Sequence, residues 1–86
     1  MTSQTDPLLS LKAGYIYESL PQKQQENVLK LAKVLPEIVE YGMATFVDNT
    51  REPYEYQYYW KQKGIKVNFK LSPQTQTPLI IDLRVD

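Results

Sequence analysis

The chain has 86 residues, of which 42% are hydrophobic and 12% aromatic, enough for one small core and too little for a deep internal pocket. Ten lysines and arginines balance ten aspartates and glutamates, which argues against a protein that coats nucleic acid or anionic membrane with its whole surface. The sequence contains no cysteine and no histidine, which excludes disulfides, thiolate metal sites, cysteine nucleophiles and histidine acid–base chemistry.

These properties predict a single domain over residues 1–86. Small secreted domains often carry disulfides, and no stretch of the chain resembles a signal peptide or a membrane span. We therefore expect a soluble, cytoplasmic protein.

The N-terminal part of the chain predicts a short helix. Residues 1–5 are polar, and we expect them to be disordered. Asp6 and Pro7 then predict a helix start, because aspartate caps exposed backbone N–H groups and proline suits the first helical position. One apolar stripe at helical spacing follows, formed by Leu9, Ala13, Ile16 and Leu20.

A second, longer helix is predicted over Gln22–Leu35. Ser19 and Gln22 have the spacing of a capping box at its start. Pro36 is expected to end or kink this helix, and one further turn over 37–41 closes at Gly42 in the left-handed conformation. The buried face combines Val28, Ala32, Leu35 and Val39.

The second half of the chain predicts strands. Met43–Asp48 reads as a first strand with no clear buried face, and a loop follows to Pro53. Tyr54–Leu71 alternates side-chain character on both sides of Lys63-Gly64, which predicts a half-buried antiparallel hairpin. Its inward residues are predicted to be Tyr54, Tyr56, Tyr58, Trp60, Ile65, Val67, Phe69 and Leu71.

The register of the hairpin follows from the turn. A two-residue turn at Lys63-Gly64 predicts that Trp60 faces Val67, Tyr58 faces Phe69 and Tyr56 faces Leu71. The same turn places Lys61 opposite Lys66.

The chain ends in a polar loop over 72–78 and a last strand over 79–85. In that strand, Leu79, Ile81, Leu83 and Val85 alternate against Ile80, Asp82 and Arg84. The elements together predict an α+β fold in which two or three N-terminal helices pack on one face of a four-stranded, mostly antiparallel β-meander.

The face of the sheet away from the helices is the candidate binding surface. Tyr59 falls on this face among amides and lysines, a combination used to stack bases of single-stranded nucleic acid and also common in protein interfaces. Lysines in such a place can equally be a solvated device against aggregation. The candidate residues are Gln57, Tyr59, Lys61, Lys66, Asn68 and Lys70.

Neither a metal site nor a catalytic site is predicted. Asp48, Glu52 and Glu55 gather carboxylates near one loop, but no ligands recur at alternate positions and no glycine turns the chain there, so we interpret them as an acidic loop. The glycines form no phosphate-binding motif. We therefore predict no cofactor and no catalytic residue.

The order of paired helices followed by antiparallel strands resembles the later part of the small RelE/ParE-type toxin fold, some of whose members cleave messenger RNA. The resemblance lies in topology alone, and the chain departs from it by lacking an opening strand and the basic charge of an RNA-cleaving member.

Three functions remain open. The first is a small non-enzymatic adaptor or accessory protein that acts through protein–protein contacts, or self-association, at the outer sheet face or a strand edge. The second is a module that binds single-stranded RNA or DNA, and the third is a toxin-like ribonuclease.

Overall fold

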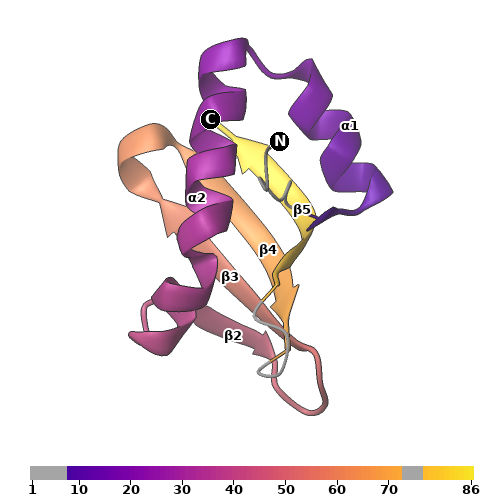
Figure 1. The fold of residues 1–86 in the computed structure, drawn as a ribbon, viewed down its shortest axis with the longest axis vertical. Helices are drawn as coiled ribbons and strands as arrows, with labels where there is room; N and C mark the ends of the chain where they lie inside the picture. Colours follow the sequence, from indigo (N-terminus) through magenta and orange to yellow (C-terminus); the bar gives the residue numbers. More distant parts are fainter. Residues whose placement is uncertain (1–7, 73–76) are drawn as a thin grey trace, which may run out of the picture.

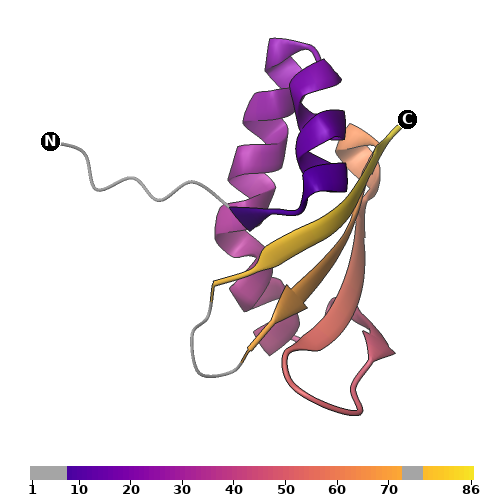
Figure 2. The ribbon, with the colours of Figure 1, turned by 90° about the vertical axis from the view of Figure 1, so that its right-hand side faces the viewer.

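Two helices cover one face of a five-stranded sheet and leave the other face open (Figures 1 and 2). The structure is a computed structural model that describes residues 8–72 and 77–86. The elements in chain order are β1 (Leu8–Leu9), α1 (Leu11–Ser19), α2 (Gln22–Glu40), β2 (Thr45–Asp48), β3 (Tyr54–Trp60), the 3-10 turn η1 (Lys61–Lys63), β4 (Ile65–Leu71) and β5 (Leu79–Val85). The predicted α+β class with N-terminal helices is confirmed.

The sheet has one strand more than predicted. Its order is β1-β5-β4-β3-β2, and β1 runs parallel to β5 while the other neighbours are antiparallel. The predicted four-stranded meander is therefore wrong in this detail, because two residues are too few to show any alternation. The sequence predicts no strand before the helices, unlike the RelE/ParE-type topology, but the structure has one, the two-residue β1.

Helix α1 starts later than predicted. Ser10 is its N-cap, and its Oγ accepts a hydrogen bond from the Ala13 N–H at 3.1 Å. The same Oγ donates to the Ile81 carbonyl at 2.9 Å, so the cap also ties the helix to β5. The predicted start at Asp6 and Pro7, like the predicted disorder of 1–5, lies outside the described residues.

Helix α2 begins at Gln22, as predicted, but without the capping box. Pro21 occupies the N-cap position with no side-chain hydrogen bond, and the Ser19 hydroxyl donates instead to the Ile16 carbonyl at 2.7 Å. The helix continues through Pro36 to Glu40 as one element.

The C-terminal end of α2 closes as predicted at Gly42. This glycine has a φ of 72°, the left-handed conformation that a Cβ atom disfavours. Its N–H donates to the Val39 carbonyl at 3.0 Å, and the Met43 N–H donates to the Ile38 carbonyl at 2.9 Å. These two bonds form a Schellman motif, which satisfies two carbonyls at the helix end.

The core lies between α2 and the central strands. On β4, every second residue is buried, from Ile65 to Leu71. Opposite them, α2 buries a broad stripe that contains Val28, Leu31, Ala32, Leu35 and Ile38. Because both faces follow the predicted periodicities of two and 3.6 residues, the two main layers of the fold were predictable.

The predicted hairpin register is wrong by two residues. Trp60 pairs with Ile65, Tyr58 with Val67, and Tyr56 with Phe69. The reason is a longer turn, in which the 3-10 turn η1 takes up Lys61–Lys63 and Gly64 closes it with a φ of 65°. A shift of two residues leaves every side chain on its predicted face.

The predicted alternation of β5 is also wrong. Ile80 and Leu83 are both buried although their positions differ in parity. A β-bulge explains this, because Asn68 pairs with Asp82 whereas the next residue, Phe69, pairs with Ile80. Ile81 is therefore the extra residue, and the strand changes face at that point.

Candidate functional site

The open face of the sheet brings together polar residues from three neighbouring strands. Tyr59 pairs with Lys66, which pairs with Arg84, and these three form one row across β3, β4 and β5. Directly paired residues share a face of the sheet. A second row follows two residues along each strand and contains Gln57, Asn68 and Asp82.

Tyr59 is the exposed aromatic residue of this face. Its exposed fraction is 47%, whereas that of Tyr56 on the helix side is 7%. The Tyr59 hydroxyl donates to Asp86 Oδ2 at 3.1 Å, and Asp86 follows β5 and lies next to Gly64, just before β4 begins. This hydrogen bond, together with the negative charge of Asp86, raises the pKa of Tyr59 above its ordinary value.

The second row is held by hydrogen bonds between its own side chains and neighbouring backbone. Gln57 Nε2 donates to Asn68 Oδ1 at 3.2 Å. Asp82 accepts from its neighbour's backbone, the Leu83 N–H, at 2.9 Å, and its other oxygen lies 3.5 Å from Lys12 Nζ. The carboxylate of Asp82 is therefore already engaged from two sides.

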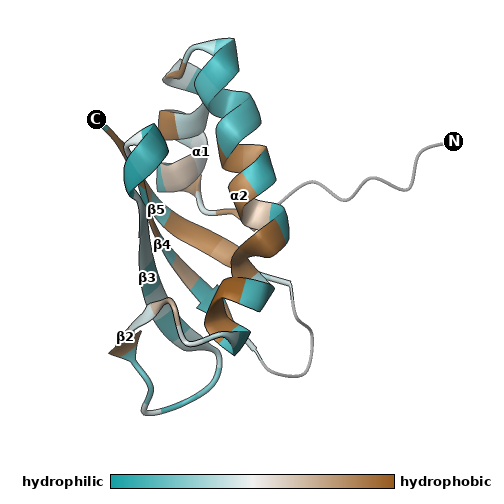
Figure 3. Cartoon of the chain, turned by 90° about the vertical axis from the view of Figure 1, so that its left-hand side faces the viewer, coloured by the Kyte–Doolittle hydropathy of each residue, from teal (hydrophilic) through white to brown (hydrophobic). Residues whose placement is uncertain are grey.

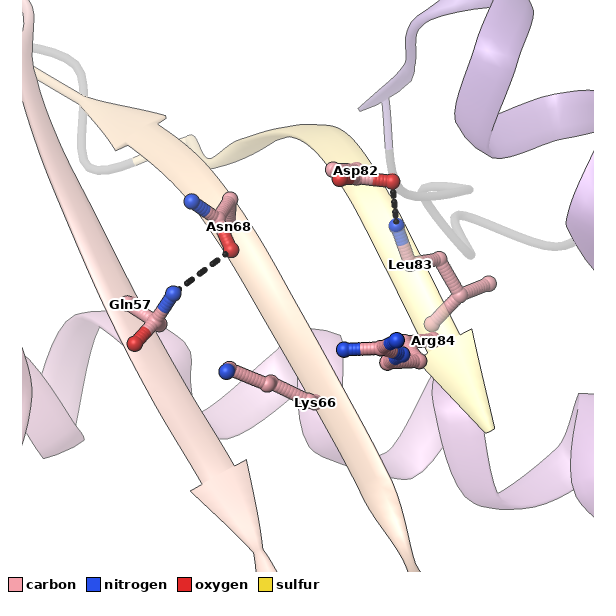
Figure 4. A pocket seen from close by; sticks show the side chains of 6 residues that line it. All are labelled: Gln57, Lys66, Asn68, Asp82, Leu83 and Arg84. Atoms are coloured by element: carbon pink, nitrogen blue, oxygen red, sulfur yellow. Dashed lines mark hydrogen bonds between the residues drawn. The ribbon is translucent and has the colours of Figure 1, made fainter. Parts of the chain in front are cut away.

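Lys66 and Arg84 are two cations placed opposite one another. Figure 4 shows both side chains on the same side of the sheet, from neighbouring strands. Within residues 8–72 and 77–86, neither forms an ion pair, since the one ion pair joins Lys12 to Asp82. They border an open hollow of about 480 Å³ that is lined by Gln57, Lys66, Asn68, Asp82, Leu83 and Arg84.

Five of the six predicted site residues lie on this open face. Lys70 pairs with Glu55 and so belongs to a third row. Lys61 is the exception, because it belongs to the turn η1 and not to a strand. Asp82 and Arg84 were missed as members, since nothing in the sequence shows which strand β5 pairs with.

A second candidate surface lies at the free edge of the sheet. Strand β2 is the last strand in the order and is exposed along its whole length. Around it, Tyr41, Met43, Phe46 and Val47 have exposed fractions of 74%, 58%, 53% and 51%. Figure 3 shows hydrophobic residues on β2 and on the last turns of α2, at the same end of the molecule.

Phe46 anchors this edge to the core. Its ring centroid lies 4.8 Å from that of Tyr56, which in turn stacks on Phe69 at 5.5 Å. The ring of Tyr54 contacts the ring of Phe46 edge-on, at a centroid distance of 6.2 Å. One side of Phe46 is thus packed against an aromatic series that leads into the core, while its other side is open. We refer to Tyr41, Met43, Phe46 and Val47 as the edge cluster.

Of the three acidic residues near the loop before β3, Asp48 and Glu55 are paired across β2 and β3. Asp48 Oδ1 accepts from the Thr50 hydroxyl at 2.6 Å and from the Thr50 N–H at 3.0 Å, and these bonds lower the pKa of Asp48. Glu55 lies across from Lys70. Among residues 8–72 and 77–86, no three carboxylates come close enough to hold a metal ion together.

In the same part of the chain, neither helix combines the length and apolar character needed to span a bilayer. Comparisons with known proteins found no significant match, whether to a family model, a curated protein or a solved structure.

Proposed function

We propose that this protein is a small non-enzymatic adaptor or accessory protein that binds a protein partner at the edge formed by β2. The observation that carries the proposal is the edge cluster, four large apolar side chains that are each more than half exposed and lie on or just before the edge strand β2, which has β3 as its one neighbour in the described sheet. Exposed apolar residues that gather at one edge of a small domain often mark an interaction surface.

The chemistry of β2 supports strand addition as the mode of contact. Edge strands are normally protected from pairing by lysine, proline, short length or a β-bulge. The segment 41–48 contains neither lysine nor proline, although β2 has four residues and a bulge between Phe46 and Asp48. The outer backbone groups of such a strand can accept another extended chain, which gives affinity through main-chain hydrogen bonds.

The expected free energy of binding shows why both the apolar side chains and the backbone of β2 are needed. Covering the exposed halves of four such side chains contributes on the order of 4 kcal/mol, at roughly 2 kcal/mol for each fully buried side chain. Association costs about 4–15 kcal/mol in lost freedom. The apolar contact alone therefore gives little net affinity, and strand pairing must supply the rest.

The test is capture of a partner from a lysate of the source cells by three forms of the protein. Val47→Lys places a charge on the free edge, whereas Tyr15→Lys makes the same kind of change on α1, where Tyr15 is 81% exposed. We expect wild type and Tyr15→Lys to retain the same partner at near-stoichiometric yield, and Val47→Lys to lose at least about tenfold in affinity for it, or 1.4 kcal/mol.

Light scattering after size exclusion, run on the same three forms, separates a foreign partner from self-association. A dimer of the wild type that becomes monomeric with Val47→Lys would identify a second copy as the partner. A wild type that is strictly monomeric and retains no more protein than Val47→Lys would contradict the proposal.

We propose no enzymatic activity. The RelE/ParE-type topology now includes an opening strand, but topology by itself specifies no reaction. The chain also has neither the histidine nor the cysteine that most often serves in acid–base or nucleophilic catalysis.

A further inference from the structure

We propose that Lys66 and Arg84 form a binding site for a phosphate group on the open face of the sheet. This site uses none of the residues of the edge cluster, so it can be tested independently of the protein-binding function. Its chemistry is that of anionic phosphate oxygens held between an ammonium and a guanidinium.

Two like charges lie opposite one another at this site. Lys66 and Arg84 are direct partners in the register of β4 and β5, and like charges placed opposite one another destabilise a sheet. Since neither cation has an ion-pair partner within the described part of the chain, an anion bound between them would remove the repulsion.

Two carboxylates lie near the two cations, one of them, that of Asp82, in the lining of the hollow itself, and each already has a hydrogen-bond or ion-pair partner. Asp82 and Asp86 flank Arg84 along the chain. Asp82 is bound by Lys12 Nζ and the Leu83 N–H, and Asp86 accepts from the Tyr59 hydroxyl. Neither lies within ion-pair distance of Lys66 or Arg84.

The hollow offers the room and the hydrogen-bond donors that a phosphate group needs. Its volume of about 480 Å³ accommodates a phosphate group with its substituent. Arg84 can donate two parallel hydrogen bonds to phosphate oxygens, and Asn68, whose Oδ1 is occupied by Gln57, retains its amide N–H donors. Because the hollow is open to water, which screens the charges, we expect a dissociation constant in the millimolar range.

The phosphate can belong to a small molecule or to a nucleic acid strand. Tyr59 lies at the far end of the same row as Arg84, two strand spacings or roughly 10 Å away. That separation suits a base stacked on Tyr59 with its phosphate held by the cations.

The experiment is a titration of the protein with sodium phosphate, followed by amide chemical shifts, against sodium chloride at equal ionic strength. We expect saturable shifts at residues 66, 68 and 84 with phosphate only. Lys66→Gln and Arg84→Gln should each weaken binding at least fivefold. Lys70→Gln removes one charge from the same face and strand and should bind as the wild type does.

Two further titrations distinguish the sources. If hexauridylate binds at least ten times more tightly than uridine monophosphate and also shifts Tyr59, the phosphate belongs to single-stranded nucleic acid. If the two nucleotides bind no more tightly than inorganic phosphate, the site serves a small phosphate compound. Equal shifts with chloride, no saturable shift at all, or unchanged binding by Arg84→Gln in a well-dispersed spectrum would overturn the phosphate site.

Discussion

Tyr58, Tyr59 and Trp60 are consecutive, yet only Tyr59 points away from the helices. The parity of a strand decides this, because successive side chains alternate between its two faces. Tyr58 and Trp60 pack against the core, whereas Tyr59 reaches across the open face to Asp86. The identity of the residue is thus less informative than its position in the alternation.

The Tyr59–Asp86 hydrogen bond predicts an alkaline titration. Asp86→Asn removes the carboxylate that holds the pKa of Tyr59 above 10.0, so the pKa should fall back toward that value. The pKa of Tyr59 is higher in the folded than in the unfolded chain. The hydrogen bond to Asp86 therefore contributes fully to the stability of the fold below about pH 10, and its contribution is lost as pH rises through the folded pKa. The carbon shift of the Tyr59 ring, followed with pH, measures the change.

Asp82→Asn is the matched control for that titration. Asp82 also carries a carboxylate on β5, but it is bound by the Leu83 N–H and Lys12 and not by Tyr59. We expect this variant to leave the Tyr59 titration close to that of the wild type. An Asp86→Asn protein whose Tyr59 titrates as in the wild type would show that the hydrogen bond is absent in solution.

Much of the residue-scale structure was predictable, since parity survives an error of register. The predicted pairing of Tyr56 with Leu71 is wrong, but both residues still face the core. The length of the turn was not predictable. A two-residue and a four-residue turn both place apolar residues of β3 opposite apolar residues of β4, so the pattern does not distinguish them. The pairing of Lys66 with Arg84 depends on β5, whose partner no local pattern shows.

At the scale of elements, two glycines differ in their relation to the helices, since Gly14 lies inside α1 and Gly42 lies beyond the end of α2. Gly14 lies in the middle of α1, and an added Cβ would meet no atom within 4 Å. Gly42 has equal room but a φ of 72°. The space around the two positions is therefore the same, and only the backbone conformation differs.

We predict opposite effects of alanine at these positions. Gly14→Ala should raise the free energy of unfolding by about 0.5–1 kcal/mol, because alanine is the better helix former. Gly42→Ala should lower it by about 1–2 kcal/mol, because a residue with Cβ is disfavoured in the left-handed conformation. Urea unfolding of both variants measures the two changes, and a Gly42→Ala protein as stable as the wild type would contradict the assigned helix end.

The elements that were missed depend on contacts distant in sequence. Strand β1 has two residues, and its backbone is tied to β5 by the Ser10 N–H, which donates to the Ile80 carbonyl at 2.9 Å. The same serine binds the bulge at Ile81. Neither a two-residue strand nor a bulge produces a local pattern, whereas α2, β3 and β4 are long enough to show theirs.

At the scale of the whole molecule, stability should be greatest at β4. This strand has neighbours on both sides, and Ile65, Val67 and Phe69 are fully buried. The outer strand β2 has one neighbour and four exposed residues. The two strands should therefore differ in their protection from hydrogen exchange, although they belong to one sheet.

Native-state hydrogen exchange measures this difference. We expect the amides of Val67 and Phe69 to exchange slowest, close to the limit set by global unfolding, and those of β2 to exchange at least about 100 times faster. Addition of a partner that extends the sheet should slow the exchange of β2 selectively. Strong protection of β2 in the isolated monomer would argue against a free edge.

The parallel pairing of β1 with β5 has a consequence for biosynthesis. Leu8 pairs with Leu79, and Ser10 bonds to a carbonyl 71 positions further along. During synthesis, β1 cannot pair until β5 has left the ribosome. A nascent chain that ends before β5 also leaves one edge of β4 unpaired. The native sheet is thus completed only after translation of β5. A nascent chain without β5 exposes the edge of β4, and exposed edges of this kind are what chaperones bind.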